Sequence, residues 1–340
     1  TVDESRTTGG GESWILNGTA TMGMEAAVAS LVDDDDELVA VVNGKFGRRF
    51  KRIAQRHCNV TAVEFDWGSP IDVDAVADAV SDDTSVVTLV HNETSTGLLN
   101  PAKEVGEIAA EHDARFIVDG VTCIGGDEFL MDEWNVDIAV TDGQKALAAP
   151  PRVSALWVAD GVAEHIDGEN APFYQDLDWH SRKAEQHQTP FTSAIPLFRG
   201  LAVAVEEIRH EGMGERIGRH REQSAAFREA MEALGLELFA QRNDVSEYSN
   251  TLTAVRLPEG ARGEELDAFF DAVADRGVSL SAGQSHIGGD IFRVRNMVNL
   301  TTVQLALLVR IVDEVFPEVF VDVDTAAGAA ARACPRRYLD

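Results

Sequence analysis

The feature that most constrains the fold is a repeated alternation of short apolar runs with amphipathic segments through the first half of the chain. Several of the runs are rich in β-branched residues and lack polar alternation, as is typical of strands covered on both faces. They lie at 38–43, 60–65, 85–91, 116–119, 137–141 and 154–158. Helical segments lie at 21–31, 45–57, 73–80, 101–111 and within 162–167. This order predicts an α/β domain with a mostly parallel sheet and helices on both faces.

The second half of the chain predicts a smaller α+β domain. Two long helical segments are separated by Gly212, and the first is long enough to bridge two lobes. These helices lie at 196–211 and 213–234, and shorter strands (251–257, 278–281, 291–295) and helices (263–276, 301–316) follow. We therefore expect a major domain over 14–200, a smaller domain over 201–318 and a loosely ordered tail over 319–340.

Polar residues follow three of the expected parallel strands, at His91, Asp119 and Thr141. Ligands of open α/β sheets lie beyond such strand ends. Downstream of Asp119 comes Lys145, in the segment Gln144-Lys145-Ala146-Leu147. An aspartate at one strand end and a lysine after another are what pyridoxal phosphate chemistry needs, because the lysine forms a Schiff base with the aldehyde and the acid keeps the pyridine nitrogen protonated. The alternative is a lysine that caps a strand with its amine in water.

The charge of the chain restricts its partners. Its formal net charge is −29, with 58 Asp and Glu residues against 29 Lys and Arg, and the acids are scattered along the sequence. Such a surface repels itself in dilute buffer and is screened within about 3 Å in molar salt. This indicates a halophilic cytoplasm, with an acidic mesophilic protein as the alternative. Nucleic acid is excluded as a partner because its phosphates require basic patches.

No pattern of metal ligands is visible. The three cysteines, Cys58, Cys123 and Cys334, are too few and too widely spaced for a zinc site or a disulfide framework, and they fit a reducing interior. His180 and His187 lack a third ligand nearby, so we expect surface histidines. No apolar run approaches ~18 residues and no signal sequence is visible, so we expect no membrane span and a cytoplasmic protein.

Several segments, taken in their order and spacing, resemble one known family. The chain resembles the class V aminotransferases of the fold type I pyridoxal phosphate group, and most of all the branch of alanine–glyoxylate and serine–pyruvate aminotransferases. The resemblance runs from about Gly18 to about Phe316. Its segments are Gly18-Thr19-Ala20-Thr21, Asn43-Gly44-Lys45-Phe46-Gly47, His91-Asn92-Glu93-Thr94-Ser95-Thr96-Gly97, Val118-Asp119-Gly120, Gln144-Lys145-Ala146-Leu147-Ala148-Ala149-Pro150-Pro151, Gln188-Thr189-Pro190-Phe191-Thr192 and Ile291-Phe292-Arg293.

The resemblance implies how the cofactor is bound. Ala20 and Thr21 precede a helix whose free N–H groups bind phosphate, although an ordinary Thr-capped helix is the alternative. Phe46 occupies the position of an aromatic ring that stacks on the cofactor. Thr94 matches a hydroxyl that contacts the ring oxygen, and Gln144 matches a phosphate ligand. Without the resemblance these three would be a core phenylalanine, a turn threonine and a solvent-facing amide.

The resemblance also implies a homodimer with shared active sites. Thr189 and Thr192 follow a His-rich stretch that we expect to be mobile, and in the family residues here reach the phosphate in the neighbouring subunit. Arg293 matches the arginine that binds the substrate α-carboxylate through two parallel hydrogen bonds. The alternative for Arg293 is an ion pair with a surface acid.

The chain also departs from the family pattern. Nothing before Trp14 matches the opening segment of the family, which we therefore expect to be absent. Arg295-Asn296-Met297-Val298 stands where the family has Gly-His-Met-Gly, and Asp142-Gly143 replaces a Gly-Ser pair, which places an extra carboxylate close to the cofactor phosphate. The desulfurases of this fold need a cysteine in the C-terminal half, and none lies between Cys123 and Cys334.

The resemblance implies transamination. The expected reaction transfers an amino group from a small L-amino acid, alanine or serine, to a small 2-oxo acid, glyoxylate or pyruvate. Lys145 and Asp119 are the expected catalytic residues. A catalytically impaired cofactor-binding protein or structural relic of the same family is the alternative.

Overall fold

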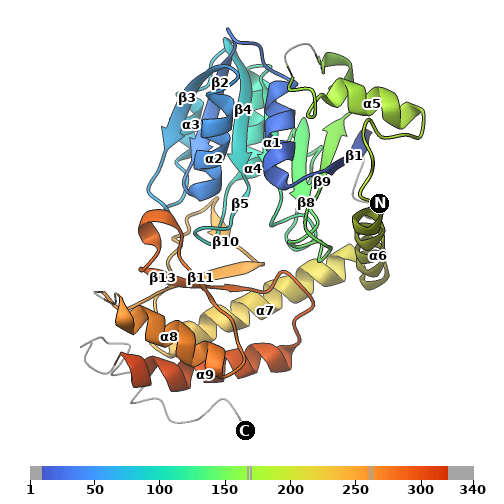
Figure 1. Ribbon diagram of the computed structural model, residues 1–340. Coiled ribbons are helices and arrows are strands. Elements are labelled where there is room, and N and C mark those ends of the chain that lie inside the picture. Colours follow the sequence, from blue (N-terminus) through green and yellow to red (C-terminus); the bar gives the residue numbers. More distant parts are fainter. Residues whose placement is uncertain (1–9, 167, 169–170, 260, 262, 321–340) are drawn as a thin grey trace.

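The central sheet of the molecule has seven strands in the order β1-β9-β8-β7-β4-β2-β3 (Figure 1). The computed structural model describes residues 10–166, 168, 171–259, 261 and 263–320. The strands are β1 (Gly11–Asn17), β2 (Glu37–Val42), β3 (Asn59–Glu64), β4 (Thr84–Val90), β7 (Arg115–Asp119), β8 (Ile138–Asp142) and β9 (Val153–Ala159). Strands β2, β3, β4, β7 and β8 are parallel, whereas β9 runs antiparallel to β8 and β1 antiparallel to β9. This confirms the predicted mostly parallel sheet.

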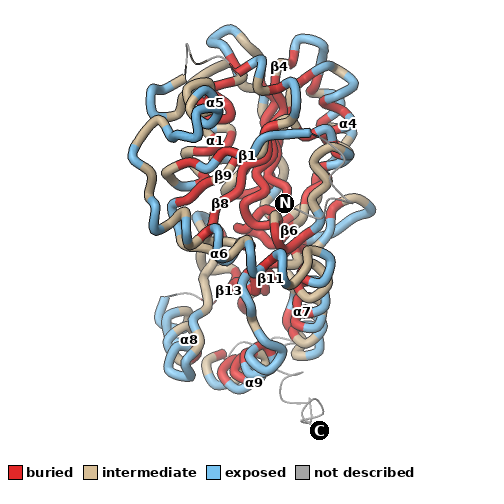
Figure 2. The backbone as a smooth tube through the Cα atoms, turned by 90° about the vertical axis from the view of Figure 1, so that its right-hand side faces the viewer, coloured by how far each residue is buried: buried red, intermediate tan, exposed pale blue. Residues whose placement is uncertain are grey.

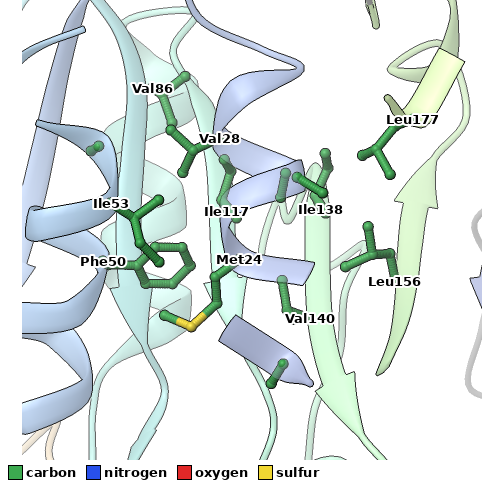
Figure 3. Packing of buried hydrophobic residues seen from close by; sticks show 14 of the residues in the cluster. Met24, Val28, Phe50, Ile53, Val86, Ile117, Ile138, Val140, Leu156 and Leu177 are labelled. Atoms are coloured by element: carbon green, nitrogen blue, oxygen red, sulfur yellow. The ribbon is translucent and has the colours of Figure 1, made fainter. Parts of the chain in front are cut away.

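Helices cover both faces of this sheet, as predicted. On one face Met24 of α1 (Ala20–Ala29) and Phe50 of α2 (Lys45–Ala54) pack on Ile117 and Val140 (Figure 3). On the other face α3 (Val73–Ala77) and α4 (Ala102–Glu111) pack on the neighbouring strand residues. Successive residues of β2 alternate between these two cores, because side chains alternate across a strand. The central strands β2, β4, β7 and β8 therefore lie deep in the molecule (Figure 2).

Two elements of this part were not predicted from the sequence. Strand β1 buries only Trp14 and Leu16, so its alternating pattern differs from the continuous apolar runs of the other strands. Helix α5 (Leu177–Glu185) contains His180, in the stretch expected to be mobile, and it begins with a side-chain cap from Asp176 to the Trp179 backbone N–H at 2.8 Å. Strand β1 alternates polar and apolar residues and α5 is mostly polar, and their buried residues Leu16 and Leu177 pack in a core formed by distant parts of the chain.

A second, smaller sheet carries the C-terminal part of the chain. Its order is β11-β13-β12, with β11 at Leu252–Arg256, β12 at Ser281–Ala282 and β13 at Ile291–Arg295. The long helices α6 (Ile195–Glu211) and α7 (Met213–Ala233) connect the two sheets, and α8 (Glu264–Asp275) and α9 (Thr302–Val319) pack against α7 and the small sheet (Figure 1). This agrees with the predicted α+β character. We refer to the seven-stranded sheet with its helices and the turns that follow its strands as the large domain, and to α7, α8, α9 and the β11-β13-β12 sheet as the small domain.

The domain limits at 14–200 and 201–318 stay predictions, and residues 321–340 of the expected tail lie outside the described part of the chain. Helix α9 continues to Val319 through Pro317, beyond the expected end at 316. Strand β12 is shorter and later than the expected strand at 278–281. Within the described residues no helix combines the length and the apolar character that crossing a membrane requires.

A further three-stranded sheet, in the order β10-β6-β5, and a polar network join the two domains. Strand β6 (Leu98–Leu99) pairs with β5 (Asn92–Glu93) and with β10 (Glu247–Tyr248). The buried Asn92 Nδ2 lies within hydrogen-bond distance of Ser249 Oγ (2.9 Å), Thr251 Oγ1 (3.0 Å) and Asp127 Oδ2 (3.2 Å). The ends of β4, β7 and β8 consequently face the small domain (Figure 1).

Candidate active site

The candidate site lies where the carboxyl ends of β4, β7 and β8 face the small sheet. Asp119 is the last residue of β7, Lys145 follows β8, and Thr94 follows β5. Arg293 comes from β13, on the opposite side, and donates through Nη1 to the Thr94 carbonyl at 2.9 Å. Residues far apart in the sequence therefore surround one location at the domain boundary.

Asp119 is a buried carboxyl group, only 5% exposed. Its Oδ1 accepts a hydrogen bond from the Val121 backbone N–H at 2.9 Å. Burial raises its pKa to about 7, and the nearby Glu93 adds to this rise, whereas Arg49 and Lys145 oppose it. A buried carboxyl group of this kind gains stability from a cationic partner, which would hold it in the charged form.

Lys145 is half-buried, and its amine makes no hydrogen bond or ion pair with a described residue. Burial lowers its pKa, and the cations Arg295 and Arg293 lower it further, while Asp119 and Asp142 act in the opposite direction. A lowered pKa increases the fraction of neutral amine, which is the nucleophilic form. Lys145 is therefore suited to attack a carbonyl group.

The start of α1 is the expected phosphate position. The Ala20 backbone N–H donates to Asp142 Oδ2 at 2.6 Å, while Asp142 Oδ1 is buried and has no partner within the described part of the chain. Thr19 provides no side-chain cap. The hydroxyl of Thr21 accepts from Arg49 Nη1 at 2.8 Å. The carboxylate of Asp142 thus occupies one donor of a helix end that favours anions, as its sequence position suggested.

Phe46 lies in the first turn of α2, and its position depends on a residue that the sequence analysis did not single out. Glu93 Oε2 accepts from the backbone N–H groups of Phe46 (2.9 Å) and Gly47 (3.1 Å). Glu93 is fully buried, and burial raises its pKa. A Cβ on Gly44 would lie 2.2 Å from Glu93 Cγ, so the close approach requires glycine there. The acid directly after a buried strand was the available signal.

The ring of Phe46 has a cationic neighbour. The guanidinium carbon of Arg49 lies 4.7 Å from the ring centroid, and this arginine connects Phe46 to Thr21. Thr94 Oγ1 lies 3.1 Å from Thr122 Oγ1 and is buried. Thr21, Phe46 and Thr94 thereby belong to one continuous set of contacts with the ends of β4 and β7.

Arg293 is held on two sides by backbone oxygens. Its Nε donates to the Ala282 carbonyl at 3.0 Å, and its Nη1 to the Thr94 carbonyl. Burial lowers its pKa to about 10, with Arg295 contributing. No ion pair joins Arg293 to a carboxylate within the described residues, so the expected alternative of a surface pair does not describe this side chain. Its Nη2 is the nitrogen left for a ligand.

The other predicted site residues, Gln144, Thr189 and Thr192, make hydrogen bonds to residues other than Thr21, Phe46, Thr94 and Arg293. Gln144 Oε1 accepts from the Arg152 backbone N–H at 3.2 Å. Thr189 Oγ1 lies 2.7 Å from Ser193 Oγ, and the Thr192 carbonyl accepts from Asn17 Nδ2 at 3.1 Å. Thr189 and Thr192 are exposed. The single chain does not bring these two threonines into contact with Lys145.

His91, noted as a strand-end residue, points away from the site. Its Nδ1 lies 2.7 Å from the Asn100 carbonyl, and its ring packs edge-on against Trp134 and Phe129. Burial lowers its pKa to about 4, so it is neutral at physiological pH. This histidine supports the fold of the strand end.

Arg216 of α7 is a second residue that the sequence did not reveal. It is 1% exposed, and its Nη2 donates to the Ala146 carbonyl (2.8 Å), next to Lys145. Its Nε donates to the Gly125 carbonyl at 2.7 Å, and its Nη1 pairs with Glu211 Oε2 at 2.7 Å. The small domain therefore fixes the turn that carries the lysine.

Several known proteins are similar to this chain in sequence and architecture. The family model "Aminotransferase class-V" matches residues 14–310. An uncharacterized aminotransferase of Methanocaldococcus jannaschii is 34% identical over 84% of this chain and 74% of that protein. The L-aspartate–glyoxylate aminotransferase of Paracoccus denitrificans is 30% identical over 94% of this chain and 81% of that protein. The structure of an alanine–glyoxylate aminotransferase from Nostoc sp. aligns with a TM-score of 0.83 at 27% identity, covering 91% of this chain and 82% of the other.

Proposed function

This chain belongs to the class V aminotransferases, which use pyridoxal phosphate, and we propose that it moves an amino group from a small L-amino acid to glyoxylate or pyruvate. Glyoxylate is in the names of two of the similar proteins described above. Alanine and serine are the donors that the sequence resemblance implies. Glyoxylate and pyruvate, the two proposed acceptors, are both small 2-oxo acids.

The observation that carries this proposal is the pair of Lys145 and Asp119 at the ends of the adjacent strands β8 and β7. The lysine amine has no partner within the described residues, and the aspartate is a buried carboxyl group with a raised pKa. An aldehyde for the amine and a cationic ring nitrogen for the carboxylate would satisfy both groups. The residues present therefore fit pyridoxal phosphate at its reactive end.

Each residue would then have a definite task. When bound, the cofactor supplies an aldehyde for the amino group and a ring that withdraws electrons from the substrate Cα. The Asp119 carboxylate would keep the proton on the ring nitrogen, and Phe46 would present a flat apolar face to the ring. Lys145 Nζ would take the proton from the substrate Cα as a general base. Arg293 would orient the substrate through its α-carboxylate.

The remaining residues would bind the phosphate and the ring oxygen. Ala20 and Thr21 at the start of α1, and Gln144 beside the lysine, are proposed phosphate ligands. Thr94 would contact the ring oxygen through its hydroxyl. Thr189 and Thr192 are exposed and make no contact with Lys145 in the single chain. We therefore propose that they bind the cofactor phosphate of the partner subunit in a homodimer.

One observation favours a second candidate, a catalytically impaired member of the family. The buried carboxyl group of Asp142 accepts the Ala20 N–H that a phosphate would use. Burial raises the pKa of Asp142, and in its charged form it would repel an anion at the same helix end. Weak cofactor retention would follow from this arrangement.

The test uses the visible spectrum and turnover of the full chain, purified in molar salt with added cofactor. We expect a yellow protein whose chromophore borohydride fixes to the peptide that contains Lys145, and which consumes glyoxylate with alanine or serine. Lys145→Ala should abolish the colour and the turnover, whereas Lys103→Ala, a change at an exposed helical lysine, should retain both. A colourless wild-type protein would refute the proposal, and colour without turnover with any donor would favour the impaired candidate.

A further inference from the structure

A second arginine lies beside the proposed carboxylate-binding arginine on strand β13. Phe292 and Val294 of this strand point into the small-domain core against α8 and α9. Arg293 points to the other side, where it donates to the Thr94 carbonyl of the large domain. Because side chains alternate along a strand, Arg295 belongs to the same face as Arg293, with Cα atoms about 7 Å apart. The two guanidinium groups therefore flank the same site.

Arg295 has no carboxylate partner within the described part of the chain. Its Nη2 donates to the hydroxyl of Ser281 on β12, the strand that pairs with β13, and its side chain is exposed. The positive charge of Arg295 acts on the site electrostatically, because it contributes to the lowered pKa of both Lys145 and Arg293.

The acidic side chains near the site already accept hydrogen bonds from other groups or have another proposed role. Glu93 accepts the backbone N–H groups at the start of α2, and Asp142 accepts the N–H of Ala20. Asp119 lies at the proposed ring nitrogen. The positive charge of Arg295 consequently has no counterpart from these three groups, and a monocarboxylic substrate would supply one anion for the two arginines.

We propose that Arg295 binds the side-chain carboxylate of a dicarboxylic amino donor while Arg293 binds its α-carboxylate, so that the preferred donor is an amino acid of the length of aspartate. This inference rests on the proposed transaminase function and replaces alanine and serine with a dicarboxylic amino acid as the preferred donor. The fork of an arginine matches a carboxylate, and the spacing along one strand suits a short donor. Alanine and serine would leave Arg295 without an anion.

The kinetic test compares L-aspartate with L-alanine at saturating glyoxylate and constant salt. We expect the wild-type kcat/KM to be at least tenfold higher for aspartate. In Arg295→Gln the ratio of the aspartate value to the alanine value should fall about 10- to 100-fold, as for a lost hydrogen bond to a charged group. Arg310→Gln removes an exposed arginine of α9 and should change neither value. Equal losses for both donors, or a wild-type preference for alanine, would overturn the inference.

A binding measurement separates this inference from the proposed function. Succinate and propionate are aspartate and alanine without the amino group, and neither can react. Isothermal titration in the presence of cofactor should show succinate binding at least tenfold more tightly than propionate in the wild type. In Arg295→Gln this ratio should fall to about one. If Arg295→Gln leaves the ratio of succinate to propionate affinity unchanged, the inference is overturned even when transamination is observed. If the protein shows no turnover but this affinity ratio falls in Arg295→Gln, only the transaminase proposal is refuted.

Discussion

Arg216 provides a quantitative test of how the small domain holds the lysine turn. The perturbation is Arg216→Met, which keeps an unbranched apolar side chain of similar length and removes the guanidinium group. Two buried carbonyl groups, of Gly125 and Ala146, would lose their charged donors, and Glu211 would lose one of its two arginines. The turn that carries Lys145 would lose its contact with α7.

The magnitude follows from burial. Each buried carbonyl left without a donor costs about 1–3 kcal/mol, and Glu211, which is partly exposed and keeps Arg219, adds little. For the two carbonyls we therefore expect the free energy of unfolding to fall by about 2–6 kcal/mol. With a urea dependence of about 3 kcal/mol per molar, the midpoint of unfolding should fall by roughly 1 M or more.

Arg219→Met is the matched control. Arg219 pairs with the same Glu211, but its side chain is 26% exposed and its acceptors are the side chains of Glu211 and Asn299. Exposed pairs contribute about 0.2–1 kcal/mol, so this variant should lose at most about 1 kcal/mol. The assay is urea unfolding followed by circular dichroism at one fixed salt concentration. Equal losses in the two variants would refute the reasoning that the buried carbonyls dominate.

Two further predictions concern charges at the site. Asp142→Asn retains an acceptor for the Ala20 N–H, so stability should change by less than about 1 kcal/mol, while loss of the negative charge should tighten pyridoxal phosphate binding at least tenfold (~1.4 kcal/mol). Fluorescence titration checks this, with pyridoxal as the phosphate-free control, and an unchanged affinity for the phosphate form would contradict it. The rate at which the apoprotein condenses with pyridoxal should rise with pH and level off below the ordinary pKa of a lysine, because burial and Arg295 lower the pKa of Lys145. Arg295→Gln removes a neighbouring cation and should move this inflection to higher pH, whereas Asp119→Asn removes an anion and should move it to lower pH; shifts in the same direction would disprove the assignment.

The repeated apolar runs were sufficient to predict the large domain. Strands buried on both faces are mostly apolar along their length, so β2, β4 and β7 could be recognised in the sequence without any knowledge of their neighbours. Asp119 and Lys145 were also predictable, because parallel strands place their carboxyl ends at one edge. In contrast, β1 alternates polar and apolar residues and α5 is mostly polar. Both are placed by distant elements, since β1 pairs with β9 and Leu177 of α5 packs in the core that contains residues of α1.

The sequence by itself determined the buried parallel strands and most helices of the large domain, and it indicated the chemistry of the lysine and the aspartate, since these depend on local periodicity and residue type. Only the tertiary structure decided which side chains complete the site. Glu93 reaches the start of α2, Arg216 reaches the carbonyl beside Lys145, and β13 places Arg293 and Arg295 together at the domain boundary. These contacts join residues separated by long stretches of chain, and such partners are selected by the packing of the two domains, which no local pattern encodes.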